Sequence, residues 1–179
     1  MAGFLAQLCQ DWEKAALKAS SLGVRTALLR TGVVLARDGG ALARMVPAFK
    51  LFLGGPLGSG RQWLSWISRD DWAGLVKHII SVDISGPVNL TAPAPVTNQD
   101  FSAALGRALL RPSWLRAPEW ALRLGLGEMA DMLLTGQKVM PAKAMSSGYS
   151  FKHPDLDSAL RDELIAAPDA GAGLRSGRP

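Results

Sequence analysis

Apolar and polar positions follow two different periods along this chain, and the change of period predicts a mixed α/β fold. Residues 4–19 carry apolar side chains every three or four positions, which is the spacing of one helix face. Residues 24–35 are almost continuously apolar after Arg25, which is typical of a strand buried on both faces, as in a parallel sheet. Arg30, Thr31 and Gly32 interrupt this run, and we expect them at the C-terminal end of the strand. The helical spacing returns over 41–53, where we expect Pro47 to kink or split the helix.

A glycine-rich segment and a two-faced strand occupy the middle of this pattern. Residues 54–60 read GGPLGSG, and residues 63–68 alternate between two kinds of side chain, which is the period of a strand. Neither spacing of a phosphate-binding loop is present, so we interpret the glycines as a tight connection at a ligand-facing edge. Ser68 is a suitable helix cap, and Asp70 and Asp71 suit the positive end of that helix better than a pair of catalytic acids.

Strand and helix continue to alternate up to residue 110. Residues 86–90 predict a short strand, and Thr97 caps a helix expected over 98–109. After Pro112 the pattern becomes mainly helical. Further helices are expected at 119–125, at 126–134 and near 154–166.

Composition and charge exclude several classes of protein. The 179 residues are 48% hydrophobic and 20% charged, which is typical of a globular protein. The net charge of +5 is scattered, with no basic run, so we expect no nucleic-acid partner. No apolar run is long enough to span a bilayer, so we expect no membrane partner. The single cysteine, Cys9, fits a cytoplasmic location, and His78 and His153 lie too far apart in sequence to suggest a metal site.

Cysteine and tryptophan positions have mainly structural interpretations. Cys9 stands on an apolar helix face, where we expect it to behave as a small core residue. Core packing is also expected of the tryptophans at helical positions, which are Trp12, Trp72 and Trp120. Trp63 and Trp66 are the tryptophans that can line a pocket.

Three stretches together resemble the extended short-chain dehydrogenase/reductase superfamily. They are Arg30-Thr31-Gly32-Val33-Val34-Leu35, then Gly58-Ser59-Gly60-Arg61-Gln62 followed by Trp66-Ile67-Ser68-Arg69-Asp70-Asp71, and finally Gly86-Pro87-Val88-Asn89-Leu90. More narrowly, the chain is similar to the epimerase-like branch that carries a small C-terminal domain of unknown function. This narrower resemblance rests on Phe4-Leu5-Ala6, on Gly54-Gly55-Pro56 and on the stretch from Leu134 to Pro141.

The resemblance implies a partial Rossmann-like, doubly wound sheet that lacks the half carrying the glycine-rich dinucleotide fingerprint. The expected division is a Rossmann-like part over 1–110, a small and mostly helical C-terminal domain over 111–166, and a disordered tail over 167–179. NAD(P) is the implied cofactor of a full-length protein, and its nicotinamide end would lie near Thr31, Gly32 and Val33. The residues implied to face a small-molecule substrate of unknown identity are Met45, Gln62, Trp66 and Ser68.

Two departures from the family pattern change the chemistry that is expected. When Glu13 is aligned with the family's glutamate, the Tyr-x-x-x-Lys pair falls on Leu5 and Cys9. Leucine donates no proton and cysteine does not replace an ammonium group, so we expect no catalytic residue in this chain. Leu64 stands where sugar-nucleotide enzymes of the superfamily commonly place an arginine, which argues against a nucleotide-sugar substrate.

These observations give one primary hypothesis and two alternatives. The primary hypothesis is the C-terminal portion of an NAD(P)-binding protein of the epimerase or oxidoreductase kind, which by itself neither binds dinucleotide tightly nor turns over substrate. The first alternative is a non-catalytic interaction module that self-associates, or binds a partner chain, through an exposed sheet edge. The second is a truncated gene model whose true start lies upstream.

Overall fold

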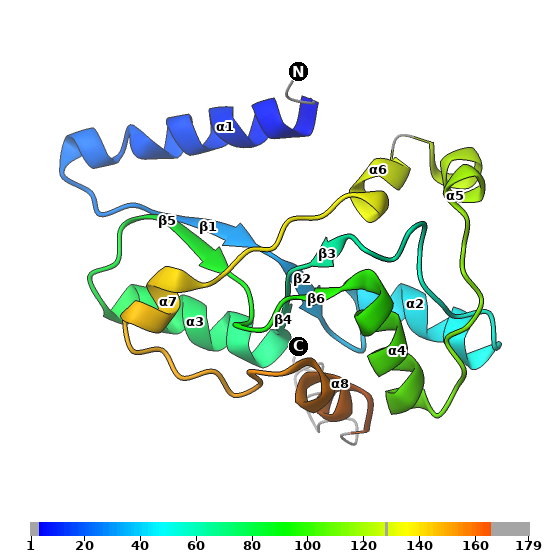
Figure 1. The fold of residues 1–179 in the computed structure, drawn as a ribbon. Coiled ribbons are helices and arrows are strands. Elements are labelled where there is room, and N and C mark those ends of the chain that lie inside the picture. Colours follow the sequence, from blue (N-terminus) through cyan, green and yellow to red (C-terminus); the bar gives the residue numbers. More distant parts are fainter. Residues whose placement is uncertain (1–3, 128, 166–179) are drawn as a thin grey trace, which may run out of the picture.

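Strands and helices alternate through most of the chain, and the last third is helical (Figure 1). This computed structural model describes residues 4–127 and 129–165. The elements up to residue 110 are α1 (Phe4–Leu17), η1 (Ser20–Leu22), β1 (Ala27–Thr31), β2 (Val33–Leu35), α2 (Gly40–Lys50), β3 (Trp63–Leu64), β4 (Trp66–Ser68), α3 (Arg69–Ser81), β5 (Gly86–Leu90), β6 (Val96–Thr97) and α4 (Asn98–Leu109). They are followed by α5 (Glu119–Leu126), α6 (Met129–Leu134), α7 (Ala142–Ser146) and α8 (Leu156–Ile165). The predicted tail over 167–179 lies outside the described residues.

In the part of the chain that the structure describes, the sheet region consists of three short strand pairs, two of them parallel and one antiparallel. β1 pairs with β5 and β2 pairs with β4, both in parallel, whereas β3 and β6 form a small antiparallel pair. The parallel pairs agree with the α/β layer pattern expected from the sequence. Among the described residues no helix is long and apolar enough to cross a membrane.

Gly32 divides the apolar stretch over 24–35 into β1 and β2, within the interruption expected at Arg30, Thr31 and Gly32. Its amide donates to the Leu90 carbonyl, and the next amide, of Val33, donates to the Ser65 carbonyl. The chain therefore changes its pairing partner at this point. A Cβ atom at Gly32 would lie 2.4 Å from the Ser65 carbonyl oxygen, so glycine is the residue that permits the close approach.

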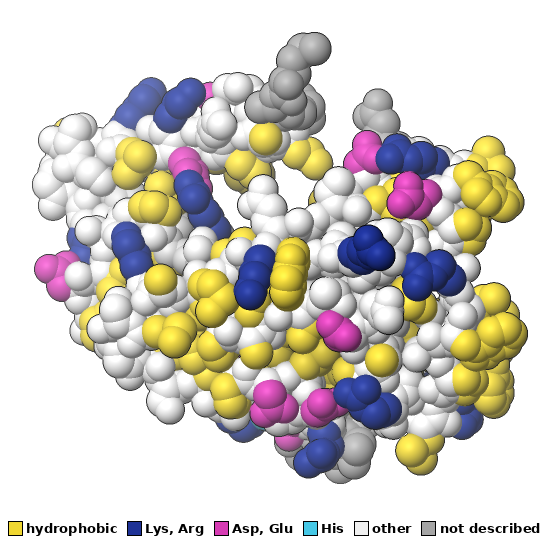
Figure 2. Space-filling view, in the orientation of Figure 1, with side chains coloured by type: hydrophobic (Ala, Val, Ile, Leu, Met, Phe, Trp, Pro, Cys, Tyr) yellow, Lys and Arg dark blue, Asp and Glu magenta, His cyan; other side chains and the backbone are white. Residues whose placement is uncertain are grey.

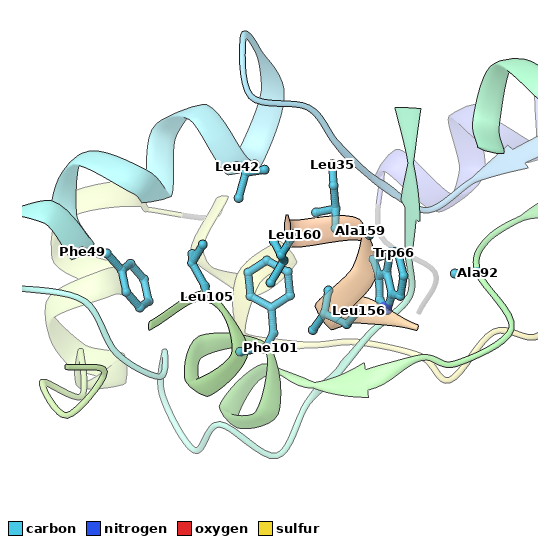
Figure 3. Packing of buried hydrophobic residues seen from close by; sticks show 11 residues of the cluster. Leu35, Leu42, Phe49, Trp66, Ala92, Phe101, Leu105, Leu156, Ala159 and Leu160 are labelled. Atoms are coloured by element: carbon cyan, nitrogen blue, oxygen red, sulfur yellow. The ribbon is translucent and has the colours of Figure 1, made fainter. Parts of the chain in front are cut away.

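Two apolar clusters hold the elements together, and β4 belongs to both. Trp66 lies in the cluster formed with α2, α4 and α8, and Figure 3 shows its side chains converging from these elements. Ile67 lies in the cluster that α3 and α7 form with β5. Successive residues of a strand point to opposite faces, so β4 separates the two clusters as the alternation over 63–68 predicts.

Three helices differ from their sequence-based expectation. α2 continues through Pro47 as one helix and is not split. On α1, Trp12 is 68% exposed and Cys9 is exposed as well, and on α5 Trp120 is 71% exposed. The predictions that these three side chains belong to the core are wrong, because an amphipathic face requires a neighbouring surface and the described residues do not cover these faces.

Candidate functional site

A cavity of about 1000 Å³ lies between α1 and β1, runs along the length of β1 and reaches the carboxyl ends of β1 and β5. Figure 2 shows the surface hollowed beside α1, which stands away from the rest of the molecule. Ligands of open α/β sheets bind at the carboxyl ends of the strands, so this position is the expected one for a ligand. The residues of the α1 wall are Ala6, Cys9, Gln10, Trp12, Glu13 and Ala16. The opposite wall is formed by residues 27–32 with Ser65, Asn89, Thr91, Gln137 and Val139.

An ion pair between Arg30 and Glu13 holds α1 over the sheet. The guanidinium Nε and Nη2 donate to the two carboxylate oxygens at 2.7 and 2.8 Å, which is a bidentate arrangement. The hydrogen bonds from Arg30 lower the pKa of the Glu13 carboxyl. Both charged side chains line the cavity and neutralise each other there.

Residues 137–140 close one end of the cavity as a strap across the strand ends. The Ser65 hydroxyl donates to the Gln137 carbonyl at 2.8 Å and accepts from the Val139 amide at 3.0 Å. The Asn89 side-chain amide donates to the Met140 carbonyl at 3.1 Å. A segment from the helical last third thus becomes part of a site built mainly by the strands.

Two of the three residues predicted to lie near the cofactor line the cavity, and the third does not. Thr31 and Gly32 line the cavity, and the Thr31 hydroxyl also accepts from the indole Nε1 of Trp72 at 3.3 Å. Val33 is not among the lining residues and packs against the core cluster that contains Trp66. Contact of Thr31, Gly32 and Val33 with a cofactor stays a prediction.

The residues predicted to face the substrate lie outside the cavity lining. Trp66 is fully buried and its indole Nε1 donates to the Ala94 carbonyl at 2.9 Å. Ser68 is buried and caps α3. Met45 packs against the core cluster of Trp66, and the Gln62 side-chain amide donates to the carbonyls of Leu57 and Leu133. Each side chain has a structural contact, and substrate binding by these four residues stays a prediction.

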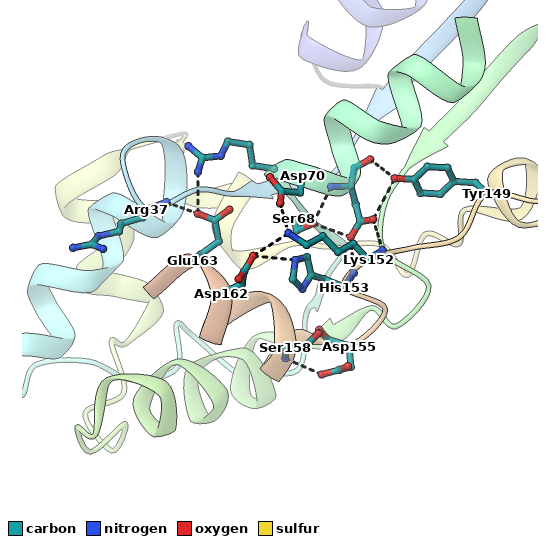
Figure 4. A network of polar contacts seen from close by, with 12 residues as sticks. Arg37, Ser68, Asp70, Tyr149, Lys152, His153, Asp155, Ser158, Asp162 and Glu163 are labelled. Atoms are coloured by element: carbon teal, nitrogen blue, oxygen red, sulfur yellow. Dashed lines mark hydrogen bonds and ion pairs between the residues drawn. The ribbon is translucent and has the colours of Figure 1, made fainter. Parts of the chain in front are cut away.

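Asp71 does more than the helix-start role that the sequence predicts. Its amide donates to the Ser68 hydroxyl, as a cap requires, while its buried carboxylate accepts from that hydroxyl at 2.8 Å. The same carboxylate accepts from the backbone amides of Lys152 and His153 at 2.7 and 2.9 Å and from the Tyr149 hydroxyl at 3.2 Å (Figure 4). Burial, followed by the nearby Asp71 charge, raises the pKa of Tyr149 to about 12.

A second carboxylate cluster lies next to Asp71 and is organised by a lysine. Asp70, His153 and Asp162 approach one another closely enough for one cation. The Lys152 ammonium lies 2.6 Å from Asp70 and 3.4 Å from Asp162, and it supplies positive charge to this group. Its hydrogen bond lowers the pKa of the Asp70 carboxyl. We interpret the cluster as an ion-pair network that fastens α8 to the start of α3.

Several residues of the site were not found by sequence reasoning. Ser65, Asn89 and Thr91 are polar residues at strand ends, and that position is the signal that could have identified them. Gln137 carries no such signal, because its place depends on how the last third folds back over the strands.

Comparison with known proteins is consistent with this geometry. Residues 117–163 match a family described as a domain of unknown function, DUF1731. An epimerase family protein of Mycobacterium leprae is 51% identical over 160 residues, which are 88% of this chain and 52% of the relative. The chain therefore spans about half the length of the curated relatives that it matches.

Solved structures give the same result for the fold. Human epimerase family protein SDR39U1 (isoform 2), whose crystal structure contains NADPH, superposes with a TM-score of 0.77 at 38% identity, over 80% of this chain and 50% of that one. A nucleoside-diphosphate sugar epimerase of Corynebacterium glutamicum gives a TM-score of 0.69 at 35% identity, over 91% of this chain and 31% of that one. These matches confirm the expected partial Rossmann-like fold of the short-chain dehydrogenase/reductase type.

Proposed function

We propose that this chain, a relative of the epimerase family proteins with a DUF1731 match, forms the nicotinamide and substrate side of an NAD(P)-dependent site. The observation that carries the proposal is the cavity between α1 and the strand ends, whose sheet wall contains Thr31 and Gly32. A structural neighbour solved with NADPH supports the choice of cofactor. The reaction class is that of an epimerase or oxidoreductase, with the substrate undefined.

The lining residues suit one end of a dinucleotide and not the other. Ser65, Asn89, Thr91 and Gln137 are uncharged polar residues, which suit hydrogen bonding to a carboxamide and a ribose. A pyrophosphate requires a helix N-terminus or free cationic groups, whereas Arg30, the one cationic residue of the lining, is paired with Glu13. The chain therefore fits the nicotinamide end and needs a second structural unit for the phosphates.

The nicotinamide group, when bound, supplies hydride-transfer chemistry, and the chain's residues orient it. The strap over 137–140 fixes the end of the cavity through Ser65 and Asn89. Cys9 lines the α1 wall at the position where the family's lysine is expected. With Leu5 at the tyrosine position, α1 contributes a wall of the cavity and no proton donor of the usual dyad.

Cofactor titration tests the proposal directly. NADPH is titrated into the purified chain, and then into the chain mixed with the part of the Mycobacterium leprae relative that this chain does not cover. We expect binding by the chain itself to be weaker than about 100 µM and binding by the mixture to be at least about tenfold tighter. Low-micromolar binding by the chain itself would contradict the need for a second unit. A mixture that associates but binds no better than the chain itself would contradict the assignment of the cavity.

The open edge of β1 favours a second candidate function, an interaction module. Among the described residues β1 pairs with β5 on one side only, and Leu29 on this strand is 42% exposed. An exposed strand edge is a template for pairing with another chain. Size-exclusion chromatography with light scattering distinguishes this candidate, because a well-folded monomer across the accessible concentration range counts against it.

A further inference from the structure

The ends of α2 and α4 meet in an exposed apolar corner on the far side of the molecule from α1. We define the α2–α4 corner as Leu51, Phe52, Leu53, Leu110 and Trp114, each of which is more than half exposed. The two segments lie side by side, since the Arg111 guanidinium stands 5.0 Å from the centre of the Phe52 ring. Figure 2 shows hydrophobic side chains gathered at the edge of the molecule where these helices end.

Two residues of the α2–α4 corner adopt a backbone conformation that normally selects glycine. Phe52 has a φ of 62° and Leu110 a φ of 53°, and both follow the last turn of a helix. Glycine is favoured at this left-handed position because it has no Cβ atom. Leu110 is 85% exposed, so packing of its side chain in the core offsets little of this backbone strain. Strained and exposed apolar residues point to a role outside the fold.

The chain segments that form the α2–α4 corner carry basic and no acidic side chains. The sequence contains no Asp or Glu between Asp38 and Asp70, and none between Asp100 and Glu119. Arg107 is neutralised by Asp157 at 2.9 Å. Lys50 and Arg111 flank the corner and make no ion pair with any residue that the structure describes.

We infer that the α2–α4 corner docks on the surface of an anionic lipid bilayer, with its apolar side chains at the acyl boundary and Lys50 and Arg111 at the headgroups. Tryptophan, phenylalanine and leucine beside basic side chains form the composition of interfacial membrane contacts. A second copy of the chain is disfavoured as the occupant, because two corners of like charge repel each other. The sequence argument against a membrane partner concerned spanning segments, and an interfacial contact needs none.

Co-sedimentation with vesicles tests the inference on the full chain. Vesicles of phosphatidylcholine are compared with vesicles containing about one third phosphatidylglycerol, and we expect at least about tenfold tighter binding to the anionic ones. The double variant Phe52→Gly/Leu110→Gly removes the two side chains at positions where glycine is the better residue for the fold. We expect this variant to remain folded and to lose at least about tenfold in vesicle binding.

Matched variants and alternative outcomes complete the test. Leu22→Ser removes a comparably exposed leucine elsewhere and is expected to bind like the unmodified chain. Lys50→Gln with Arg111→Gln is expected to reduce the preference for anionic vesicles. Equal binding to both vesicle types, or full binding by the glycine variant, would overturn the inference. The inference would also be overturned if the chain formed a dimer and bound no vesicles, and if the glycine variant abolished that dimer. The α2–α4 corner would then be assigned to contact with a second copy of the chain.

Discussion

The buried Asp71 carboxylate accepts hydrogen bonds from several groups around it, so replacing Asp71 is expected to lower the stability of the fold. In Asp71→Asn an NH2 group replaces one of the two carboxylate oxygens, so the backbone amide of either Lys152 or His153 loses its buried acceptor. We expect the free energy of unfolding to fall by about 3 kcal/mol, measured by denaturant titration. Asp38→Asn serves as the control, because Asp38 forms an exposed pair with Arg69 whose loss is expected to cost less than about 1 kcal/mol. Equal effects of the two variants would contradict the role assigned to Asp71.

The raised pKa of Tyr149 makes the free energy of unfolding depend on pH in the alkaline range. Its pKa rises from 10.0 to about 12 on folding, so its neutral form stabilises the folded state fully below pH 10. That contribution is lost as the pH rises through about 12. Tyr149 is the chain's single tyrosine, so phenolate absorbance reports this residue without interference. We expect a native titration midpoint well above that of the denatured chain, and Tyr149→Phe should remove this component of the pH dependence.

The left-handed backbone conformation of Phe52 and Leu110 predicts that glycine at either position stabilises the fold. Phe52→Gly and Leu110→Gly each relieve the crowding of a Cβ atom, and we expect each to raise the free energy of unfolding by about 1 kcal/mol. Leu51→Gly is the matched control, since Leu51 has a φ of −85° and gains nothing from glycine. A loss of stability in both left-handed variants would show that these side chains serve the fold.

At the scale of elements, one ion pair joins α1 to the sheet among the described residues, between Glu13 and Arg30. In Glu13→Gln the bidentate pair with Arg30 is lost, and we expect amide hydrogen exchange to accelerate throughout α1 while α3 stays unchanged. Asp11→Asn is the control, because Asp11 contacts Gln7 and Lys14 within the same helix. Unchanged exchange in Glu13→Gln would mean that other contacts hold α1 in place.

Periodicity predicted the elements well and their partners poorly. The helix caps at Ser68 and Thr97 follow from local chemistry, and both are confirmed. An interruption at residues 30–32 was predicted, but the change of pairing partner there depends on a carbonyl 33 residues away, which no local pattern contains. The apolar face of α1 was visible in the sequence, but its lack of a covering surface was not. For the same reason the strap over 137–140, which completes the cavity, could not be predicted.

At the scale of the whole molecule, the cavity and the open edge of β1 share one surface, because residues of β1 line the cavity. The chain spans about half of the relatives it matches, and its cavity is walled by α1 and the strand ends. A unit that pairs with β1 would also lie next to this cavity, because β1 supplies part of the lining. The two candidate functions therefore predict contact at the same surface, and they differ in whether cofactor affinity appears when that contact forms.

The buried carboxylate of Asp71 also predicts which segments of the molecule unfold together. It lies in the first turn of α3, while three of its hydrogen-bond donors lie between residues 149 and 153. Releasing this segment would remove three of the donors to a buried charge and leave the Ser68 hydroxyl, so α3 and the segment are expected to open as one cooperative unit. Native-state hydrogen exchange should give the Lys152 amide the same opening free energy as the central amides of α3. The segment over 117–163 that matches the family would then be a sequence family that does not fold independently of α3.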